Sequence, residues 1–287
     1  MSILGVVFLY FPNIDQFISN INCYIGNIDK LIIWQNSSID VHTKDLIRQK
    51  TNAKKIVFRG NGENIGLPIA INNVLSEFGN SYEYLLTMDQ DSRWLNFEEY
   101  MKAIEENKDK NQRIGIYGPQ IITKYSCPNS ASEDIVDHVI TSGAMYRIEI
   151  FRKIGGFRED YFIDALDEEI CLRARKNKIE TLKVNKGVLF QEFGDTVEKT
   201  FFGKKFFYMK HSSFRNYYIV RNHIYLLKEY NMNFEKKNQI IQSYIIRQAI
   251  KILLFDESKL SKLNNIYKGI IDGIKFKKKK SNIKFPL

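Results

Sequence analysis

Two aspartates directly after an apolar run are the sharpest chemical feature of the sequence. The run Tyr84–Met88 leads into Asp89, Gln90 and Asp91. At the end of a strand the pleat breaks, so both carboxylates can turn toward one cation. Hard divalent ions such as Mg²⁺ or Mn²⁺ prefer oxygen ligands of this kind, and such an ion would neutralise a diphosphate leaving group. A polar turn with two aspartates is the alternative interpretation, because such turns are common.

A second acidic cluster lies where a helix is expected to begin. Asp164, Asp167, Glu168 and Glu169 open a helical pattern that ends in basic residues, and we predict a helix over Asp167–Asn177. The helix dipole favours charged carboxylates at this end, where one of them can accept a proton from an attacking hydroxyl. The alternative is simple N-terminal capping, which acidic residues also provide.

The elements that position these residues follow an alternating pattern in the first 113 residues. Apolar runs at Ile3–Tyr10, Leu31–Trp34, Lys55–Phe58 and Tyr84–Met88 alternate with helix-like stretches at Ile14–Ile25, Val41–Asn52 and Leu67–Phe78. This order predicts an α/β fold with a mostly parallel sheet and helices on both faces. Ligands of such sheets bind beyond the carboxyl ends of the strands. We therefore expect the turns that carry Asn36, Asn64 and Asp89–Asp91 to be neighbours.

The remaining chain is expected to be less regular and then helical. Ile114–Gln120 and Val139–Arg147 read as strands, and the chain from Phe206 onward reads as helical, aromatic and basic. Residues 239–255 have the pattern of an amphipathic helix, with Arg247 and Lys251 one turn apart.

Composition excludes several classes of protein. The 287 residues are 44% hydrophobic, too apolar for a disordered chain, yet contain no run of roughly 18 apolar residues that would span a bilayer. The first residues lack the features of a signal peptide. Three isolated cysteines favour neither a disulfide framework nor a zinc site, and they fit a reducing cytosol.

Charge is distributed unevenly along the chain. Residues 1–199 hold 24 Lys and Arg against 28 Asp and Glu, whereas residues 200–287 hold 19 against 5. The basic part, with the run Lys277–Lys280 beside Phe276, suits contact with an anionic membrane surface. A packed helix with a disordered lysine tail is the alternative. Nucleic acid is not expected as a partner, because no helix-turn-helix, zinc-finger or RNP pattern is present.

Motifs in order along residues 3 to about 230 resemble those of the inverting nucleotide-sugar glycosyltransferases of family 2, which have a GT-A fold. The matching segments are the opening strand and turn Val6–Pro12, the Asn36–Ser38 turn, the N-x-G-x-x-x-A-x-N segment Asn64–Asn72, the D-x-D motif Asp89–Ser92, Ser142-Gly143, Ile154–Phe157, the F-I-D-x-x-D-x-E-x-x-x-R segment Phe162–Arg173, and the R-x-Y-Y-x-x-R-N segment Arg215–Asn222. The D-Q-D-S, F-I-D and Y-Y-x-x-R-N forms are most similar to the bacterial rhamnosyltransferase branch.

The resemblance implies a role for each matching residue. Asp167 would be the general base that deprotonates the acceptor hydroxyl, and Asp91, with Asp89, would bind Mg²⁺ or Mn²⁺. The donor-binding residues would be Tyr10, Phe11, Pro12, Gln35, Asn36, Ser37, Asn64, Gly66, Asp89 and Gln90. The residues that bind acceptor or phosphate would be Ser142, Gly143, Asp164, Glu168, Arg215, Tyr218 and Arg221.

Two positions depart from the family pattern. Gln35 stands where an acid usually precedes the asparagine of the second turn, which implies either a weaker contact with the nucleotide base or a shifted register. Gln191 stands where many relatives have a histidine, and an amide is a poor substitute for an imidazole ligand. The third metal ligand would then be Gln191, Glu192 or Asp195, or the metal would be held mainly by Asp91 and the diphosphate.

Together these observations predict a metal-dependent inverting glycosyltransferase that moves a sugar, with rhamnose from dTDP-rhamnose as the leading candidate. The acceptor would be a glycan or lipid-diphosphate-linked glycan in bacterial surface polysaccharide synthesis. Residues 1–230 would form the catalytic domain, with a nucleotide-sugar half (1–113) and an acceptor half (114–230). Residues 231–287 would form a helical basic extension. We expect a cytoplasmic protein, peripheral on the inner face of the membrane. The alternative is a non-catalytic protein that binds a nucleotide-sugar or lipid diphosphate.

Overall fold

The computed structural model describes residues 1–287 except 129–132, 193–195, 202–203 and 277–287. The chain forms two compact units. The first comprises Met1–Glu159 and Leu166–Glu192. The second comprises Asp160–Ala165 and the described residues beyond Glu192. A short segment of the second unit therefore interrupts the sequence of the first.

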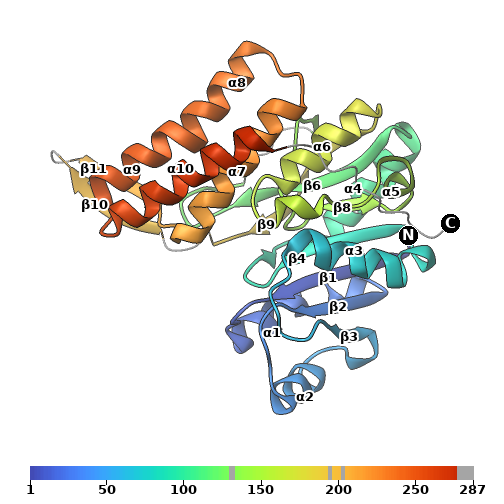
Figure 1. The fold of residues 1–287 in the computed structure, drawn as a ribbon. Helices are drawn as coiled ribbons and strands as arrows, with labels where there is room; N and C mark the ends of the chain where they lie inside the picture. Colours follow the sequence, from blue (N-terminus) through green and yellow to red (C-terminus); the bar gives the residue numbers. More distant parts are fainter. Residues whose placement is uncertain (129–132, 193–195, 202–203, 277–287) are drawn as a thin grey trace. The chain divides into compact units, whose positions relative to one another are not determined.

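The first unit is built on a nine-stranded sheet in the order β3-β2-β1-β4-β8-β6-β9-β5, with β7 paired to β9 (Figure 1). The strands β3, β2, β1 and β4 are parallel to one another, β8 is antiparallel to both β4 and β6, and β9 is parallel to β6. Their bounds are β1 Ile3–Leu9, β2 Lys30–Gln35, β3 Ile56–Arg59, β4 Tyr84–Asp89, β5 Arg93–Trp94, β6 Ile114–Ile122, β7 Asp134–Ile135, β8 Met145–Arg147 and β9 Glu180–Phe190. The expected mostly parallel α/β sheet is confirmed.

Helices surround this sheet, so its central strands are apolar on both faces. Every residue of β1 is buried, as expected for a parallel strand that is covered on two sides. The helices of the unit are α1 Ile14–Asn22, α2 Val41–Gln49, α3 Leu67–Phe78, α4 Phe97–Lys110, α5 Glu149–Ile154 and α6 Leu166–Lys176. The predicted bounds of α3 are reproduced, and those of α1, α2 and α6 differ only at their ends.

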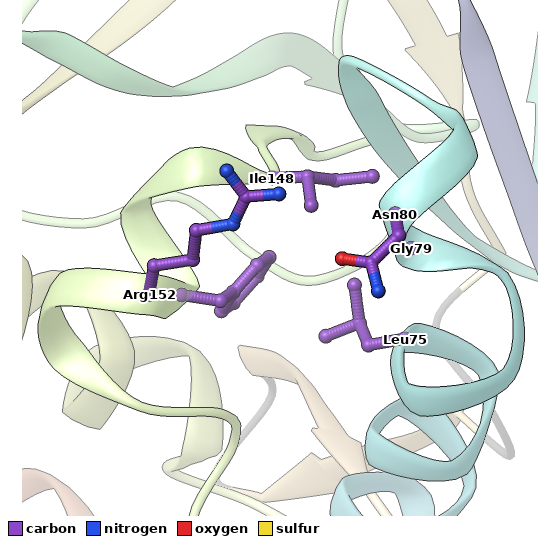
Figure 2. Close-up of a pocket in the computed structure, with 6 residues that line it drawn as sticks. Leu75, Gly79, Asn80, Ile148 and Arg152 are labelled. Atoms are coloured by element: carbon purple, nitrogen blue, oxygen red, sulfur yellow. The ribbon is translucent and has the colours of Figure 1, made fainter. Parts of the chain in front are cut away.

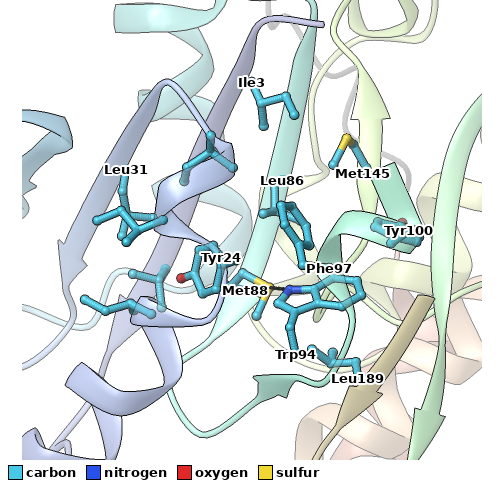
Figure 3. Close-up of a cluster of buried hydrophobic side chains, with 14 of the residues drawn as sticks. Ile3, Tyr24, Leu31, Leu86, Met88, Trp94, Phe97, Tyr100, Met145 and Leu189 are labelled. Atoms are coloured by element: carbon cyan, nitrogen blue, oxygen red, sulfur yellow. Dashed lines mark hydrogen bonds between the residues drawn. The ribbon is translucent and has the colours of Figure 1, made fainter. Parts of the chain in front are cut away.

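A large aromatic and aliphatic cluster packs one face of the sheet against its helices (Figure 3). It joins Met88 of β4 to Trp94 of β5 and to Phe97 and Tyr100 of α4. The centroid of the Trp94 ring lies 4.9 Å from that of Phe97 and 4.7 Å from that of Tyr100. The Trp94 Nε1 donates to the Met88 sulfur at 3.2 Å. This packing fixes the chain on both sides of Asp89–Asp91.

The expected strand over Val139–Arg147 is wrong for most of its length, because only β8 is extended. The chain turns at Gly143, whose φ is +76°, and the Gly143 N–H donates to the Thr87 carbonyl at 2.8 Å. The preceding residues bend to meet the end of β4 and cannot continue a strand. This turn brings Ser142 to the end of β4.

The second unit contains a two-stranded antiparallel hairpin and a group of helices. Its elements are β10 Thr196–Phe201, β11 Lys204–Met209, α7 Ser213–Glu229, α8 Phe234–Ile240, the π-helical segment Ile241–Ile246, α9 Arg247–Phe255 and α10 Lys259–Lys275. Val220 and Ile224 of α7, Ile252 of α9 and Ile266 of α10 form the centre of its core. Among the described residues, no helix is long and apolar enough to cross a membrane.

The expectation of continuous helix from Phe206 onward is corrected at its start. Residues up to Met209 pair with β10, and the helix begins only after Ser212, whose side chain accepts from the Arg215 N–H. Backbone pairing with a neighbouring strand decides the conformation there over local propensity. The helical pattern of residues 239–255 is present, with a π-helical segment before α9. The lysine run at 277–280 lies outside the described residues.

Candidate functional site

The turns after β1, β2 and β4 meet at one edge of the sheet because β1 lies between β2 and β4. The Gln90 Oε1 accepts from the Tyr10 N–H at 2.8 Å, and the Gln90 Nε2 donates to the Tyr10 carbonyl at 3.0 Å. The Ser37 hydroxyl accepts from the Phe11 N–H at 2.8 Å. Two side chains thus tie the three turns together. We call Tyr10–Pro12, Gln35–Ser38 and Asp89–Ser92 the three-turn edge.

The turn after β3 lies against the second of these turns. The Gln35 Nε2 donates to the carbonyls of Arg59 and Gly60 at 3.3 and 3.1 Å. Gly62 has a φ of +88°, and a Cβ there would lie 2.9 Å from the Ser38 Cα, so glycine permits this close approach. The amide of Gln35, where the family pattern has an acid, therefore holds a neighbouring loop.

Within the described part of the chain, three further predicted donor residues, Asn36, Asn64 and Gly66, form no side-chain bond between the turns. Asn36 is buried, and its Oδ1 has no hydrogen-bond partner among the residues that the structure describes. The Asn64 side chain accepts from the Gly66 N–H at 3.1 Å, and Gly66, at φ +85°, precedes α3. The turns that carry Asn36 and Asp89–Asp91 are joined through the three-turn edge, and Asn64 follows the loop that Gln35 contacts.

Asp89 is held from two directions. Its N–H donates to the Ser142 hydroxyl at 3.2 Å, and that hydroxyl donates to the buried Ser92 hydroxyl at 2.8 Å. The Gln191 Nε2 donates to the Asp89 Oδ2 at 3.0 Å. The structure therefore brings together the D-x-D segment, the Ser142-Gly143 turn and Gln191, the residue that stands in place of the family's histidine. Asp89 and Gln191 are 102 positions apart in the sequence.

Asp91 has the electrostatics of a cation ligand. Burial raises the pKa of its carboxyl, and the charge of Glu192 raises it further. The Gln191 Oε1 is also buried without a partner among the described atoms. A cation beside these oxygens would offset the cost of burying them. The described residues contain no group of three or more His, Cys, Asp or Glu side chains placed to hold a metal. Asp91, Asp89 and the Gln191 amide thus fit a divalent ion only with ligands from a bound diphosphate.

Asp167 lies in the first turn of α6 and has the properties of a base. Burial raises the pKa of its carboxyl to about 6, with a further contribution from the charge of Glu168. The Asp167 Oδ1 accepts from the Glu168 N–H at 3.0 Å. A carboxylate with this pKa is ionised at neutral pH yet more basic than an ordinary aspartate. Burial raises the pKa of the Tyr146 hydroxyl in β8, and the charge of Asp167 acts in the same direction.

His138 is a neighbour of Asp167 that sequence reasoning left without a role. Its charge acts to lower the Asp167 pKa, against the effect of burial. The expected strand over Val139–Arg147 gave no reason to place His138 beside α6. No local sequence pattern links the two residues.

Three motif residues prove to be structural anchors. The Glu169 carboxylate, which is 1% exposed, receives two bonds from the Arg173 guanidinium at 3.0 and 2.9 Å. Arg173 also donates to the Ile154 carbonyl at 2.6 Å. Asn72 of α3 bonds both the N–H and the carbonyl of Phe157 at 2.8 Å. These bonds fasten α6 and α3 to the Gly155-Gly156-Phe157 turn.

The second unit holds the segment that leads into Asp167, which we call the 160–165 loop. Phe162, Asp164 and Ala165 have positive φ angles of 45°, 63° and 59°, an unusual run for residues other than glycine. Asn222 of α7 is fully buried, and its Nδ2 lies 2.7–2.9 Å from the carbonyls of Tyr161, Ile163 and Asp164. One amide therefore holds the strained conformation.

The predicted acceptor residues of α7 contact the same loop. The Arg215 guanidinium forms a two-atom ion pair with Asp164, with the Nη2 to Oδ1 distance at 2.9 Å. The Tyr218 ring stacks on Phe162 at a centroid distance of 5.1 Å. The Arg221 guanidinium donates to the Asn222 Oδ1 and to the Asp160 carbonyl. Contact of either arginine with a phosphate stays a prediction.

A separate pocket lies far along the strands from the three-turn edge (Figure 2). It is lined by Leu75, Gly79 and Asn80 at the end of α3 and by Ile148 and Arg152 around the start of α5. The Ile148 N–H donates to the Glu83 carbonyl, just before β4 begins, whereas Asp89 ends β4. None of the predicted site residues lines this pocket.

Comparisons with known proteins now bear on this site. No family model matches the chain. The dTDP-rhamnosyl transferase RfbF of Shigella flexneri is 24% identical over 307 aligned positions, which cover 96% of both chains. The solved structure of Staphylococcus aureus TarS 1–349 matches with a TM-score of 0.54 at 15% identity, covering 96% of this chain and 81% of that one. The mannosyltransferase PcManGT of Pyrobaculum calidifontis, in complex with GDP-Man and Mn²⁺, matches with a TM-score of 0.58 at 11% identity, covering 92% and 73%.

These matches define the class of the protein. The chain has the GT-A fold, as the resemblance of its motifs predicted. Within that class, its similarity to RfbF extends over nearly the whole of both chains and supports a relationship to the rhamnosyltransferases.

Proposed function

We propose that the protein is a metal-dependent inverting glycosyltransferase that transfers rhamnose from dTDP-rhamnose to a hydroxyl of a glycan or lipid-linked glycan. The observation that carries the proposal is the meeting of Asp89 with Ser142 and Gln191 at the carboxyl edge of the parallel strands. Ligands of such sheets bind at this edge. The similarity to a dTDP-rhamnosyl transferase supports the choice of sugar and nucleotide.

The nucleotide-sugar would lie across the three-turn edge. Tyr10 and Phe11 are exposed there, at 52% and 78%, and an exposed aromatic pair at a binding edge suits stacking on a base or sugar. Asn36 and Ser37 line the next turn, and Asn64 and Gly66 follow the loop beside it. Because the Gln35 amide is bonded to the Arg59 and Gly60 carbonyls, we propose that it shapes the base pocket through this loop.

A divalent ion, Mg²⁺ or Mn²⁺, would be held by Asp91 and Asp89 with the Gln191 Oε1 and the donor diphosphate. When bound, it would neutralise the negative charge that develops on the leaving diphosphate. The structures of PcManGT and of GalNAc-T7 were both determined with Mn²⁺. Gln191 would orient the Asp89 carboxylate through its Nε2.

Asp167 would remove the proton from the acceptor hydroxyl. The hydroxyl oxygen then attacks the anomeric carbon from the face opposite the nucleotide, the bond from that carbon to the diphosphate oxygen breaks, and the configuration inverts. The proton ends on the Asp167 carboxyl, whose pKa of about 6 suits a base that acts near neutral pH. We propose contacts with the acceptor or a phosphate for Ser142, Gly143 and Glu168 of the first unit, and separately for Asp164, Arg215, Tyr218 and Arg221 of the second.

The proposed organisation places catalysis in residues 1–230 and an accessory role in residues 231–287. We propose that the latter region brings the enzyme to the inner face of the cell membrane, where a lipid-diphosphate-linked acceptor would be found. The lysine-rich tail would contribute by binding anionic headgroups.

The test is calorimetric titration of the protein with dTDP-rhamnose, UDP-GlcNAc and GDP-mannose, each with and without Mn²⁺. We expect metal-dependent binding of dTDP-rhamnose and its loss in Asp91→Ala. Glu98→Ala is the matched control, because it removes an exposed carboxylate of α4 outside the proposed site and should leave binding in place. Binding of a different donor would refute dTDP-rhamnose as the donor. Metal-independent binding with no transfer to any acceptor would favour a non-catalytic binding protein.

A further inference from the structure

Helix α10 carries an apolar stripe that the second unit leaves uncovered. Leu260, Tyr267 and Ile274 are spaced seven residues apart and are 86%, 62% and 58% exposed. Residues at this spacing lie on one side of a helix within a few tens of degrees. The stripe therefore runs the length of α10.

Packing of the opposite side of α10 fixes the direction of this stripe. Gly269 and Gly273 face α7, and a Cβ at Gly269 would lie 2.7 Å from the Tyr217 carbonyl oxygen. A Cβ at Gly273 would lie 2.7 Å from the Ile224 Cβ. The close approach of the two helices depends on these glycines, so α10 cannot rotate to bury Leu260, Tyr267 and Ile274 against α7.

The adjacent helix α9, together with Ile246 just before it, has a stripe of the same kind. Ile246, Ile250, Leu253 and Leu254 are each about half exposed and follow the i, i+4, i+7, i+8 pattern of one helix face. Ile252 points the other way, into the core that it shares with Ile266 of α10. The two helices run side by side (Figure 1). The second unit therefore presents two exposed apolar stripes.

Charges beside the stripes are predominantly basic. Lys268 and Lys275 each follow a stripe residue of α10 and are exposed, as are Lys259 and Arg247. The exposed acids in this region are Glu257 and Asp272, and the Asp272 carboxylate accepts from the Tyr217 hydroxyl at 2.8 Å. Isoleucine, leucine and tyrosine flanked by lysines are the composition of a helix that lies in a lipid interface.

We propose that the exposed stripes of α9 and α10 dock this protein on an anionic lipid surface, with the apolar side chains inserted and the flanking lysines on the headgroups. Charge favours lipid over a second copy of the chain. In a symmetric dimer the same basic residues would face each other, whereas anionic headgroups neutralise them. The proposal deepens the membrane role proposed above for residues 231–287 and rests on it. The residues that carry it are all described, and it does not depend on the donor, the metal or the lysine run at 277–280.

The test is co-sedimentation of the full-length protein with phosphatidylcholine vesicles that contain or lack phosphatidylglycerol. We expect binding to the anionic vesicles only. The triple variant Leu260→Ser, Tyr267→Ser, Ile274→Ser should lower the partition coefficient about tenfold or more, because the inserted apolar area is lost without any change of charge. The matched control is Val41→Ser, Leu95→Ser, Tyr125→Ser, which alters three exposed apolar residues of the first unit and should bind as the parent does.

Further variants separate the sources of binding. Replacing Lys268 and Lys275 by Gln should weaken binding about fivefold for each lysine at low salt. Unchanged binding of the α10 triple variant, with all affinity lost on replacing Lys277–Lys280 by Gln, would overturn the proposal. A concentration-dependent dimer that the triple variant abolishes, with no vesicle binding by the parent, would also overturn it. Donor titration of the same variants is expected to be unchanged, so failure here is distinguishable from failure of the proposed function.

Discussion

The three-turn edge and the 160–165 loop are both held in place by hydrogen bonds, but from different sources. At the three-turn edge, short side chains bond the backbone of the turn beside them, and sheet order has already made those turns neighbours. The 160–165 loop instead adopts positive φ angles and depends on Asn222 and Arg215 of a helix about 60 residues later. The geometry of the proposed donor site is thus a property of the sheet, whereas the segment that leads into Asp167 depends on tertiary contacts with α7.

The comparison predicts that the two regions can be damaged separately. Asp167→Asn should reduce transfer by about 10³-fold, because the amide cannot accept the acceptor proton, while donor affinity stays unchanged. The measurement is the initial rate of transfer alongside donor calorimetry. Glu168→Gln, which removes the adjacent carboxylate, should cost far less. If both variants lose donor binding, Asp167 belongs to the donor pocket and the distinction fails.

Asn222→Ala should have the next largest effect. It frees three carbonyls of the 160–165 loop, and we expect transfer to fall about 100-fold through misplacement of the chain before Asp167. Loss of these buried bonds should also lower the free energy of unfolding by about 2 kcal/mol.

Asn216→Ala is the control for this variant. Asn216 is an equally buried asparagine of α7, and its Oδ1 accepts from Gln248 at 2.7 Å, away from the loop. If Asn216→Ala loses as much stability as Asn222→Ala but transfers sugar at the normal rate, the role of Asn222 is supported. Equal losses of transfer in the two variants would show that the effect comes from destabilising α7.

The pH dependence should distinguish the two regions in the parent protein. Because burial raises the Asp167 pKa to about 6, transfer should fall about tenfold per pH unit below that value as the base becomes protonated. Folding favours the protonated form of this carboxyl, so its contribution to stability is greatest at low pH and is lost as pH rises through about 6. Donor binding measured over the same range would show whether the loss belongs to the acceptor side. A flat rate between pH 5 and 7 would contradict the role of Asp167.

The smallest effect is expected at the three-turn edge. Ser37→Ala removes the bond to the Phe11 N–H, and we expect donor affinity to fall about fivefold with an unchanged rate at saturation. Calorimetry and saturating kinetics measure the two quantities. Ser19→Ala, which alters an exposed serine of α1 outside the three-turn edge, is the control. A fall in the saturating rate would mean that this turn also positions the acceptor.

The three-turn edge was easier to predict from the sequence than the contacts between distant residues, because local patterns determine strands and their turns. Alternating apolar runs and helical stretches predicted β1 to β4 and α3, and the rule for parallel strands then predicted that the turns at Asn36 and Asp89–Asp91 would be neighbours. The contact of Gln191 with Asp89 joins residues 102 apart, and no local pattern encodes it. The bend at Gly143 depends on the Thr87 carbonyl, so a run that looked extended was predicted as a strand.

The roles of single motif residues were the hardest to predict. A recognisable spacing does not tell a residue that contacts substrate from one that supports it. Arg173 and Asn222 stand in such motifs, yet the structure uses them to fasten the backbone. Propensity also failed around β11, where pairing with β10 determines the conformation.

The long-range support of the 160–165 loop also sets an order of events during synthesis. The loop leaves the ribosome 58 to 61 residues ahead of Asn222, on which its three carbonyls depend. At the usual speed of translation, about 3 to 12 seconds separate the two. During that interval a nascent chain can complete the three-turn edge, whereas the segment before Asp167 has no partner to stabilise its left-handed conformation. The protein should therefore acquire the capacity to bind its donor before it acquires the capacity to use it.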